Sequence, residues 1–275
     1  MSGNTIVQVG SVGVETYGAH RFEGRVAVVT GAARGIGEAV ARRLIAEGAT
    51  VYALDLRAEL LAETWAGVER AVPVPTDVAD SAAVDAAFER VRAEHGVLHH
   101  LVAAAGIPDA PKRAGDFPGD PDLSTIDDES WDLVIRVNLT GTFYCLRAAV
   151  PLIQANGPAG GSIVTLSSVG ALYPYPLAAA YPASKGGIIG LTRAVAALVA
   201  PDNIRVNAIA PAATDTKMLP EDKEHLAELT RLQLFDKVVP ASEMAANIVY
   251  LLSDEAAFMT AQTVSVSGGM VANGG

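Results

Sequence analysis

The sequence predicts a single α/β domain built on a doubly wound parallel sheet of seven strands. Short runs rich in β-branched residues alternate with longer segments whose apolar residues recur three and four positions apart, as in Ile36, Val40 and Leu44. Several runs are apolar almost throughout, which is typical of parallel strands covered on both faces. The runs span residues 25–30, 50–55, 71–75, 98–104, 162–167, 204–210 and 262–267. Strands and helices alternating at this spacing favour a Rossmann-type architecture.

The alternation predicts one domain over residues 22–275, preceded by a flexible N-terminal tail at 1–21. Two segments interrupt the pattern, and each follows the end of a predicted strand. Residues 107–127 are rich in Pro, Gly and Asp, and residues 212–240 include a short helical stretch from about 221 to 235. Ligands of open α/β sheets bind beyond the carboxyl ends of the strands. We therefore expect both segments near the site, with 212–240 forming a substrate lid.

The chain is strongly acidic, because 20 Lys and Arg against 31 Asp and Glu give a formal net charge of −11. Such a surface repels phosphate backbones and anionic lipid, so neither nucleic acid nor a membrane is an expected partner. No stretch approaches the ~20 apolar residues of a membrane span, and the first 20 residues do not resemble a signal peptide. We therefore expect a cytoplasmic protein. Cys145 is the single cysteine, so no disulfide or cysteine-rich zinc site is expected, and no metal.

A glycine-rich loop follows the first predicted strand. The segment 30–37 reads TGAARGIG, and its glycines permit a tight turn and a close approach of backbone N–H groups to a pyrophosphate. The charge of that pyrophosphate then lies at the N-terminus of the following helix. An ordinary glycine turn is the alternative interpretation. The predicted dinucleotide contacts of this loop are Gly31, Arg34, Gly35, Ile36 and Gly37.

Asp55 ends the second predicted strand, 18 residues after Gly37. A carboxylate there can accept hydrogen bonds from the adenosine ribose and would repel a 2′-phosphate, which favours NAD over NADP. Arg34 and Arg57 are close enough in sequence to receive a 2′-phosphate, so NADP remains the less favoured alternative, and a strand-end cap is a further interpretation of Asp55. Asp77, after the third strand, fits equally well an acceptor for the adenine amino group or a helix cap.

A second motif, YPASK at residues 181–185, carries acid–base chemistry. On a helix Tyr181 and Lys185 share one face. An ammonium beside a phenol favours the phenolate and lowers the tyrosine pKa from its usual value near 10. The phenol can then exchange a proton with a substrate oxygen near neutral pH. Ser167 and Ser168 end the preceding strand, and a serine hydroxyl there can hold the same oxygen.

These motifs together resemble the short-chain dehydrogenase/reductase family. The resemblance runs from about residue 22 to residue 270 and implies hydride transfer between a nicotinamide dinucleotide and a secondary alcohol or ketone. It also implies a homotetramer assembled through the helices around 128–150 and 181–199. The resemblance is carried by TGAARGIG, Asp55, TDV at 76–78, VNLTG at 137–141, Ser168, YPASK and VNAIAP at 206–211.

The resemblance implies a role for each matching residue. Tyr181 matches the general acid/base, Lys185 the residue that holds the nicotinamide ribose and tunes the tyrosine, and Ser168 the residue that orients the substrate oxygen. Asn138 matches the residue that positions a water for proton relay, and Thr216 the threonine that contacts the carboxamide. The remaining implied cofactor contacts are Val78, Ala105, Gly106, Pro211 and Thr214.

Four sites depart from the family pattern. The segment 103–106 reads AAAG where two asparagines are usual, which puts the rigidity of the middle of the sheet in doubt. His99 stands where an aspartate is common, Ala212 replaces a glycine, and Ser267 replaces a frequent aspartate. None of the four belongs to the implied Ser-Tyr-Lys set.

The substrate remains open. Tyr173, Tyr175 and Met218 are candidates to line a partly apolar pocket, which favours a secondary alcohol or ketone with apolar bulk, and ordinary packing of these residues is an equally open interpretation. Two other functions fit the same motifs: a non-catalytic NAD-binding protein that acts through a partner, and a non-redox dehydratase or epimerase on the same fold.

Overall fold

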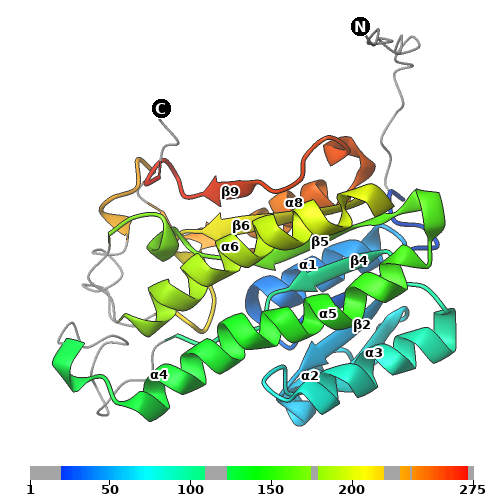
Figure 1. Cartoon of the computed structure of the whole chain (residues 1–275), viewed down its shortest axis with the longest axis horizontal. Helices are drawn as coiled ribbons and strands as arrows, with labels where there is room; N and C mark the ends of the chain where they lie inside the picture. Colours follow the sequence, from blue (N-terminus) through cyan, green and yellow to red (C-terminus); the bar gives the residue numbers. More distant parts are fainter. Residues whose placement is uncertain (1–19, 109–122, 175–178, 220–229, 236, 272–275) are drawn as a thin grey trace, which may run out of the picture.

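The computed structural model describes residues 20–108, 123–174, 179–219, 230–235 and 237–271. Seven parallel strands form one sheet in the order β3-β2-β1-β4-β5-β6-β9 (Figure 1). Each strand overlaps its predicted range, so the predicted fold class is confirmed. The strands are β1 (Val26–Thr30), β2 (Thr50–Asp55), β3 (Ala71–Pro75), β4 (His100–Ala103), β5 (Gly161–Leu166), β6 (Ile204–Pro211) and β9 (Thr263–Val266).

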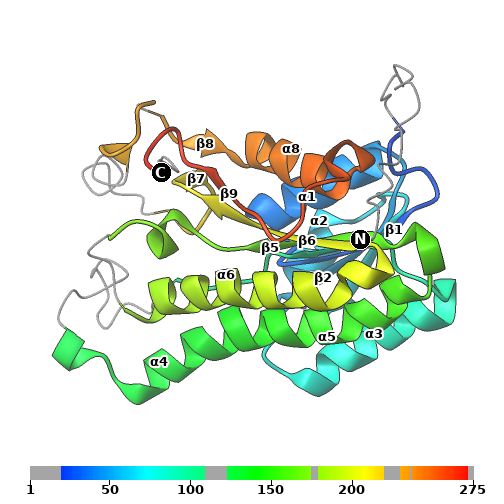
Figure 2. The same ribbon diagram turned by 45° about the horizontal axis from the view of Figure 1, so that its top comes forward.

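Helices cover both faces of the sheet, which gives the protein three layers (Figure 2). Successive strand residues point to opposite faces, so Val28 packs in the core under α5 whereas Val29 packs in the core under α1. One face carries α1 (Gly35–Ala46), α2 (Ala58–Thr64) and α8 (Ala241–Leu252). The other carries α3 (Ser81–His95), α5 (Gly141–Gln154) and α6 (Ala180–Val199), and α4 (Asp128–Ile135) leads into α5 through a π-helical turn, η2 (Arg136–Thr140).

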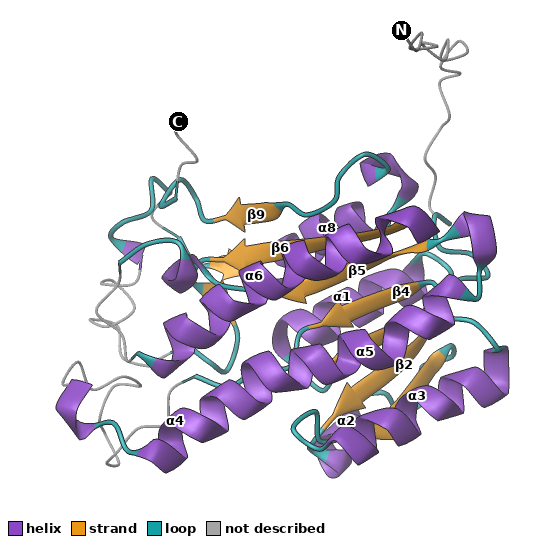
Figure 3. Cartoon of the chain, viewed as in Figure 1, coloured by secondary structure: helices purple, strands orange, loops and turns teal. Residues whose placement is uncertain are grey.

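The strand order determines where a ligand can bind. The chain builds β1, β2 and β3 outward in one direction, then returns to place β4 on the other side of β1. All strands point the same way, so the loops at their carboxyl ends gather along one edge of the sheet (Figure 3). The connections diverge at the β1–β4 boundary, which opens a crevice at that edge.

Two helical runs, Asp128–Gln154 and Ala180–Asp202, are long and apolar enough to cross a membrane by length and composition alone. In this structure α5 contacts β4 and α6 contacts β6, whereas α4, the first part of the former run, contacts α6. Core helices of folded domains pass the same test, and these helices pack partly on the sheet. Some apolar side chains on these helices nevertheless remain exposed, among them Trp131, Phe143 and Leu198.

The segment 212–240 has more strand structure than the sequence predicts. Its ends pair as a small parallel sheet of β7 (Thr214–Asp215) and β8 (Val239–Pro240). Most of the expected helix from about 221 to 235 falls outside the described residues, and residues 230–235 form turns. The two paired ends fix where the segment leaves and rejoins the domain.

Arg21 fastens the start of the described chain to the domain. Its Nε and Nη2 donate to the carboxylate of Glu47 at 2.6 and 2.8 Å, and its Nη1 donates to Glu255 at 2.8 Å. The sequence places Arg21 at the end of a flexible tail, whose residues 1–19 lie outside the described part of the chain. Arg21, which the sequence assigns to the flexible tail, is therefore already bound to the folded domain.

Two adjacent histidines lie at the amino-terminal edge of the sheet. His99 Nδ1 accepts a hydrogen bond from the backbone N–H of Val26 at 3.0 Å, so an imidazole serves where the family commonly has a carboxylate. His100 is buried, and its Nδ1 lies 2.8 Å from Ser162 Oγ. Because Ser162 Oγ donates to the Leu252 carbonyl at 2.7 Å, the fitting donor to Ser162 is the His100 Nδ1–H. Within the described residues His100 Nε2 has no hydrogen-bond partner.

This arrangement predicts acid-sensitive stability. Burial holds the pKa of His100 well below its usual range, with His99, Arg25 and Arg205 adding to the effect. Below about pH 6.5 the unfolded chain therefore binds a proton that the folded chain does not, and the free energy of unfolding falls by up to about 1.4 kcal/mol per pH unit. Urea denaturation at pH 7.5 and 5.5 measures this loss.

His100→Asn is the matched variant, because an Asn amide N–H can replace the donor to Ser162 Oγ without titrating. We expect it to be less stable at pH 7.5, since it leaves space beside Phe22, but to lose less stability between pH 7.5 and 5.5 than the wild type does. An unchanged pH dependence in this variant would assign the acid sensitivity to other groups.

Candidate active site

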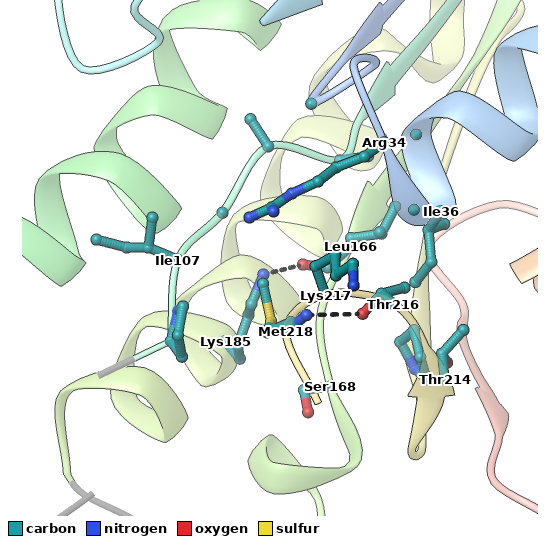
Figure 4. Close-up of a pocket in the computed structure, with 18 of the residues that line it drawn as sticks. Arg34, Ile36, Ile107, Leu166, Ser168, Lys185, Thr214, Thr216, Lys217 and Met218 are labelled. Carbon is teal, nitrogen blue, oxygen red and sulfur yellow. Dashed lines mark hydrogen bonds between the residues drawn. The ribbon is translucent and has the colours of Figure 1, made fainter. Parts of the chain in front are cut away.

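A cavity of about 530 Å³ opens at the carboxyl edge of the sheet, and the loops that follow all seven strands contribute to its lining (Figure 4). It collects almost all of the residues that the sequence marks as functional, although they are spread over most of the chain. Those in its lining are Gly31, Arg34, Gly35, Ile36, Gly37, Asp55, Asp77, Val78, Ala105, Gly106, Ser168, Tyr181, Lys185, Pro211, Thr214, Thr216 and Met218. Asn138 and Tyr173 are not in the described lining, and Tyr175 lies outside the described residues.

The glycine loop has the shape of an anion cradle. Gly31 and Gly35 adopt φ of 67° and 65°, a region that favours glycine. A Cβ on Gly37 would lie 2.3 Å from the Gly31 carbonyl oxygen, so only glycine allows this close backbone contact. Helix α1 begins at Gly35 with no side-chain cap, which leaves the N–H groups of its first turn for an anion at the cavity wall. These observations fit the pyrophosphate of a dinucleotide.

Asp55 is held in place at the end of β2. One carboxylate oxygen accepts from the Ala33 N–H at 3.1 Å, and the other accepts from the Arg57 N–H at 3.1 Å and the Arg57 Nε at 3.3 Å. The side chain is 5% exposed, against 42% for that of Arg57. Arg34 reaches into the cavity from the glycine loop (Figure 4). The cavity thus presents a fixed carboxylate with two guanidinium groups nearby.

Asp77 lines the cavity after β3 and also closes a turn, since its Oδ1 accepts from the Ala79 N–H at 2.9 Å. The N-cap of α3 is a different residue, Asp80, whose side chain accepts from the Ala82 N–H at 2.9 Å. Asp80, and not Asp77, therefore caps α3, which removes the helix-cap interpretation of Asp77. The second Asp77 carboxylate oxygen is compatible with a contact to adenine.

The AAAG segment is held without asparagine amides. Thr30 Oγ1, at the end of β1, accepts from the backbone N–H groups of Ala104 and Ala105 at 3.0 Å each. A Cβ on Gly31 would come within 3.0 Å of Ala105 Cα, so the two loops are in close contact. The Thr30 hydroxyl thus holds this segment in place, although the two asparagines that are usual in the family are absent.

Ser168, Tyr181 and Lys185 meet at the end of β5 and the start of α6. Lys185 is buried, and its Nζ donates to the Leu166 carbonyl at 2.9 Å (Figure 4). The same Nζ lies 5.5 Å from the centre of the Tyr181 ring. Burial lowers the pKa of Lys185 to about 8, so the side chain is still mainly an ammonium at pH 7. Ser168 Oγ accepts from the Gly170 N–H at 3.1 Å, which leaves its own proton available for a substrate oxygen.

The neighbouring serine has a different function. Ser167 is buried, and its Oγ donates to the Lys185 carbonyl at 2.9 Å, so it ties β5 to α6. Both serines line the cavity, but the Ser167 hydroxyl proton is used in this bond, whereas Ser168 Oγ accepts a hydrogen bond and keeps its proton for a ligand.

Asn138 lies behind the cavity wall, in the π-helical turn between α4 and α5. Its Oδ1 accepts from the Ile107 N–H at 2.8 Å, and its Nδ2 donates to the Ile107 carbonyl at 2.9 Å and to Ser184 Oγ at 3.1 Å. The side-chain amide is thus engaged with the protein on both sides. These contacts use both N–H groups of Nδ2, so a water at Asn138 would have to donate, either to Oδ1 or to the backbone carbonyl, which also accepts from Thr142 Oγ1 at 2.7 Å.

Near Ser168 and Tyr181 the lining includes several apolar side chains, among them Val169, Met218 and Met270. Met218 contributes as expected, whereas the Tyr173 N–H donates to the Val169 carbonyl and the tyrosine is half-buried outside the lining. The described lining also includes residues that the sequence did not mark individually, among them Leu56, Pro108, Val169, Lys217 and Met270. All five lie in segments that follow strands, a position that could have marked them.

A doubly wound sheet whose crevice joins a glycine cradle to a Tyr–Lys pair defines a dinucleotide-binding oxidoreductase. A family model described as enoyl-(acyl carrier protein) reductase matches residues 31–271. The chain belongs to the short-chain dehydrogenase/reductase family, as the motifs predict.

Curated and solved relatives agree with this assignment. The chain is 37% identical over 252 residues to 2-dehydro-3-deoxy-L-rhamnonate dehydrogenase (NAD(+)) of Sphingomonas sp. strain SKA58, covering 91% of this chain and 97% of the relative. It is 37% identical over 260 residues to a 3-oxoacyl-(acyl-carrier-protein) reductase of Thermotoga maritima, covering 91% and 99%. A crystal structure of a 3-oxoacyl-(acyl-carrier protein) reductase with bound NAD from Brucella melitensis superposes with a TM-score of 0.81 at 36% identity, covering 92% of this chain and 94% of that chain.

Proposed function

We propose that the protein transfers a hydride between NAD(H) and a secondary alcohol or ketone of partly apolar character. The observation that carries the proposal is that Ser168, Tyr181 and Lys185 line the same cavity as the glycine cradle. A dinucleotide bound with its pyrophosphate at α1 would extend its nicotinamide towards these three residues, where it supplies or accepts the hydride. The partly apolar character of the substrate is supported by apolar side chains that line the same cavity, among them Val169, Met218 and Met270.

Tyr181, Lys185 and Ser168 each have a separate role in the proposed proton transfer. Tyr181 gives its phenol proton to the carbonyl oxygen in reduction and takes a proton from the alcohol in oxidation. The Lys185 ammonium, 5.5 Å from the ring centre, stabilises the phenolate that remains. The Ser168 hydroxyl donates to the same substrate oxygen and fixes its position. A buried lysine and a backbone-anchored serine need little rearrangement for this task.

NAD is proposed over NADP because the adenosine end contains the anchored Asp55 carboxylate. We expect Asp55→Ala to weaken NADH binding and to lower the ratio of NADPH to NADH dissociation constants by about tenfold or more, since a charge repelling the 2′-phosphate is lost. Nicotinamide fluorescence measures both dissociation constants.

Asp55→Asn separates charge from packing, because an amide of the same size can still accept from the Ala33 N–H. It should lower the NADPH to NADH ratio as Asp55→Ala does. A ratio unchanged in both variants would mean that Asp55 serves only to hold the loop.

The proposal as a whole is tested by titrating the protein with NADH and NADPH in parallel and then adding a panel of ketones. Tighter NADH binding followed by ketone-dependent loss of nicotinamide fluorescence supports it. Binding without turnover across the panel would favour the non-catalytic or non-redox alternatives. Absence of binding for both nucleotides would refute the dinucleotide function.

The proposal includes a homotetramer assembled through the faces of α4, α5 and α6. Its support is the exposure of apolar side chains on these helices, with Trp131 38% and Leu198 76% exposed. Burying such groups between subunits would remove apolar surface from water.

A further inference from the structure

The cavity divides into two halves that differ in charge. The loops after β1, β2 and β3 form the half that receives the adenosine in the proposed function. Two of its side chains are cationic and two are anionic, so their formal charges sum to zero. They are Arg34, Arg57, Asp55 and Asp77.

In the other half, which would receive the nicotinamide and the substrate, the formal charges of the lining side chains do not sum to zero. It is built from the loops after β4, β5, β6 and β9 together with α6. Its charged lining residues, within the part of the chain that the structure describes, are Lys185 and Lys217, with no Asp or Glu. In a chain with a net charge of −11, this is a locally positive surface. Such a concave surface attracts anions.

The two lysines differ in whether their ammonium groups can contact a substrate. Lys185 is buried, donates to the Leu166 carbonyl and lies beside the Tyr181 ring, so it belongs to the proton-transfer group. Lys217 is exposed in the turn that the Leu219 N–H closes on the Thr216 carbonyl at 3.1 Å. In the described parts of the chain no carboxylate lies within ion-pair distance of Lys217, whereas Lys237, further along the same segment, pairs with Glu243 at 3.7 Å.

The surroundings of Lys217 suit one charged group on an otherwise apolar molecule. Met218, Leu219 and Met270 line the same half and can cover a hydrocarbon skeleton. A mostly apolar pocket with one positioned polar group is the usual way in which a protein fixes the orientation of a small ligand. A single ammonium at its edge selects for an anion.

We propose that Lys217 is a specificity residue that recognises a carboxylate on the substrate, so that the enzyme acts on oxo- and hydroxycarboxylic acids. The inference rests on the proposed function and adds the substrate class. The competing source of negative charge is the cofactor pyrophosphate, and the test separates the two.

The test compares 4-oxocyclohexanecarboxylate with 4-oxocyclohexanecarboxamide, two ketones of one shape that differ in charge, with NADH as reductant. The wild type should show a kcat/KM about tenfold higher for the acid, and this preference should fall with added salt. Lys217→Gln should abolish the preference, and Lys217→Glu should reverse it. Lys237→Gln removes the same charge from the same segment outside the cavity and should keep the wild-type preference.

Two outcomes would overturn the proposal. One is an equal kcat/KM for acid and amide in the wild type. The other is an acid preference that persists in Lys217→Gln, including the case in which this variant only raises the dissociation constant for NADH, because that result would assign Lys217 to the pyrophosphate.

A failure of the proposed redox function would look different. If neither ketone is reduced, acid and amide are compared as ligands of the NADH complex through nicotinamide fluorescence. Tighter binding of the acid that Lys217→Gln abolishes would support carboxylate recognition while refuting ketone reduction. Equal binding of the two would overturn the carboxylate inference.

Discussion

Tyr181→Phe is expected to lower kcat by about a thousandfold, because general acid–base catalysis by one side chain contributes about 10² to 10⁴ in rate. The phenylalanine keeps the ring that lies beside Lys185 but has no proton to exchange with the substrate oxygen. The dissociation constant for NADH should change by less than about threefold, since the ring itself is retained. Steady-state kinetics and nicotinamide fluorescence measure the two quantities.

The matched control is Tyr250→Phe, which removes the same hydroxyl from a half-exposed tyrosine on α8, outside the cavity lining. It should keep wild-type kinetics. A Tyr181→Phe enzyme with near-normal kcat would mean that another group exchanges the proton. Loss of NADH binding together with activity would instead assign Tyr181 to cofactor binding.

Gly37→Ala should abolish measurable NADH binding, with an increase in dissociation constant of about a hundredfold or more, equivalent to about 2.7 kcal/mol. The new Cβ would lie 2.3 Å from the Gly31 oxygen and 3.0 Å from the Thr30 oxygen. Both neighbours are backbone atoms, so no side-chain rotation can relieve the contact. The loop must move, and the N–H groups that would face the pyrophosphate move with it.

Gly190→Ala is the control for the added methyl group, because within the subunit a Cβ on Gly190 meets nothing within 4 Å and alanine favours the helix. It should bind NADH as the wild type does and unfold at the same or a higher temperature. Thermal unfolding of Gly37→Ala shows whether the variant remains folded. A folded Gly37→Ala protein with normal NADH binding would refute a pyrophosphate site at this loop.

Features that depend on neighbouring residues could be predicted from the sequence. The β-branched runs located all seven strands of the main sheet, because strands covered on both faces read as short, nearly continuous apolar runs. Glycine spacing located the turn between β1 and α1. The four-residue spacing of Tyr181 and Lys185 placed both on one helix face, and Asp55 stands at the end of β2 as its position in the sequence predicts.

Other features depend on which segments meet after folding. The sequence does not reveal that the Asn138 amide pairs with the backbone of Ile107, 31 residues away, or that Thr30 holds the turn at Ala104. Tyr173, which the sequence suggests for the substrate pocket, is not in the described lining, whereas Met270, in the segment after β9, is.

The sequence by itself thus determined the fold class, the family and the chemical groups at the site, because each is encoded in a short periodic pattern or in the spacing of a motif. Tertiary structure alone decided which loops share the cavity and how charge is divided across it. Strand order brings Met270 and Lys217 into the lining that also contains Lys185, whereas both lining aspartates follow β2 and β3. Electrostatic and packing forces act through space between side chains remote in sequence, so no local pattern records them.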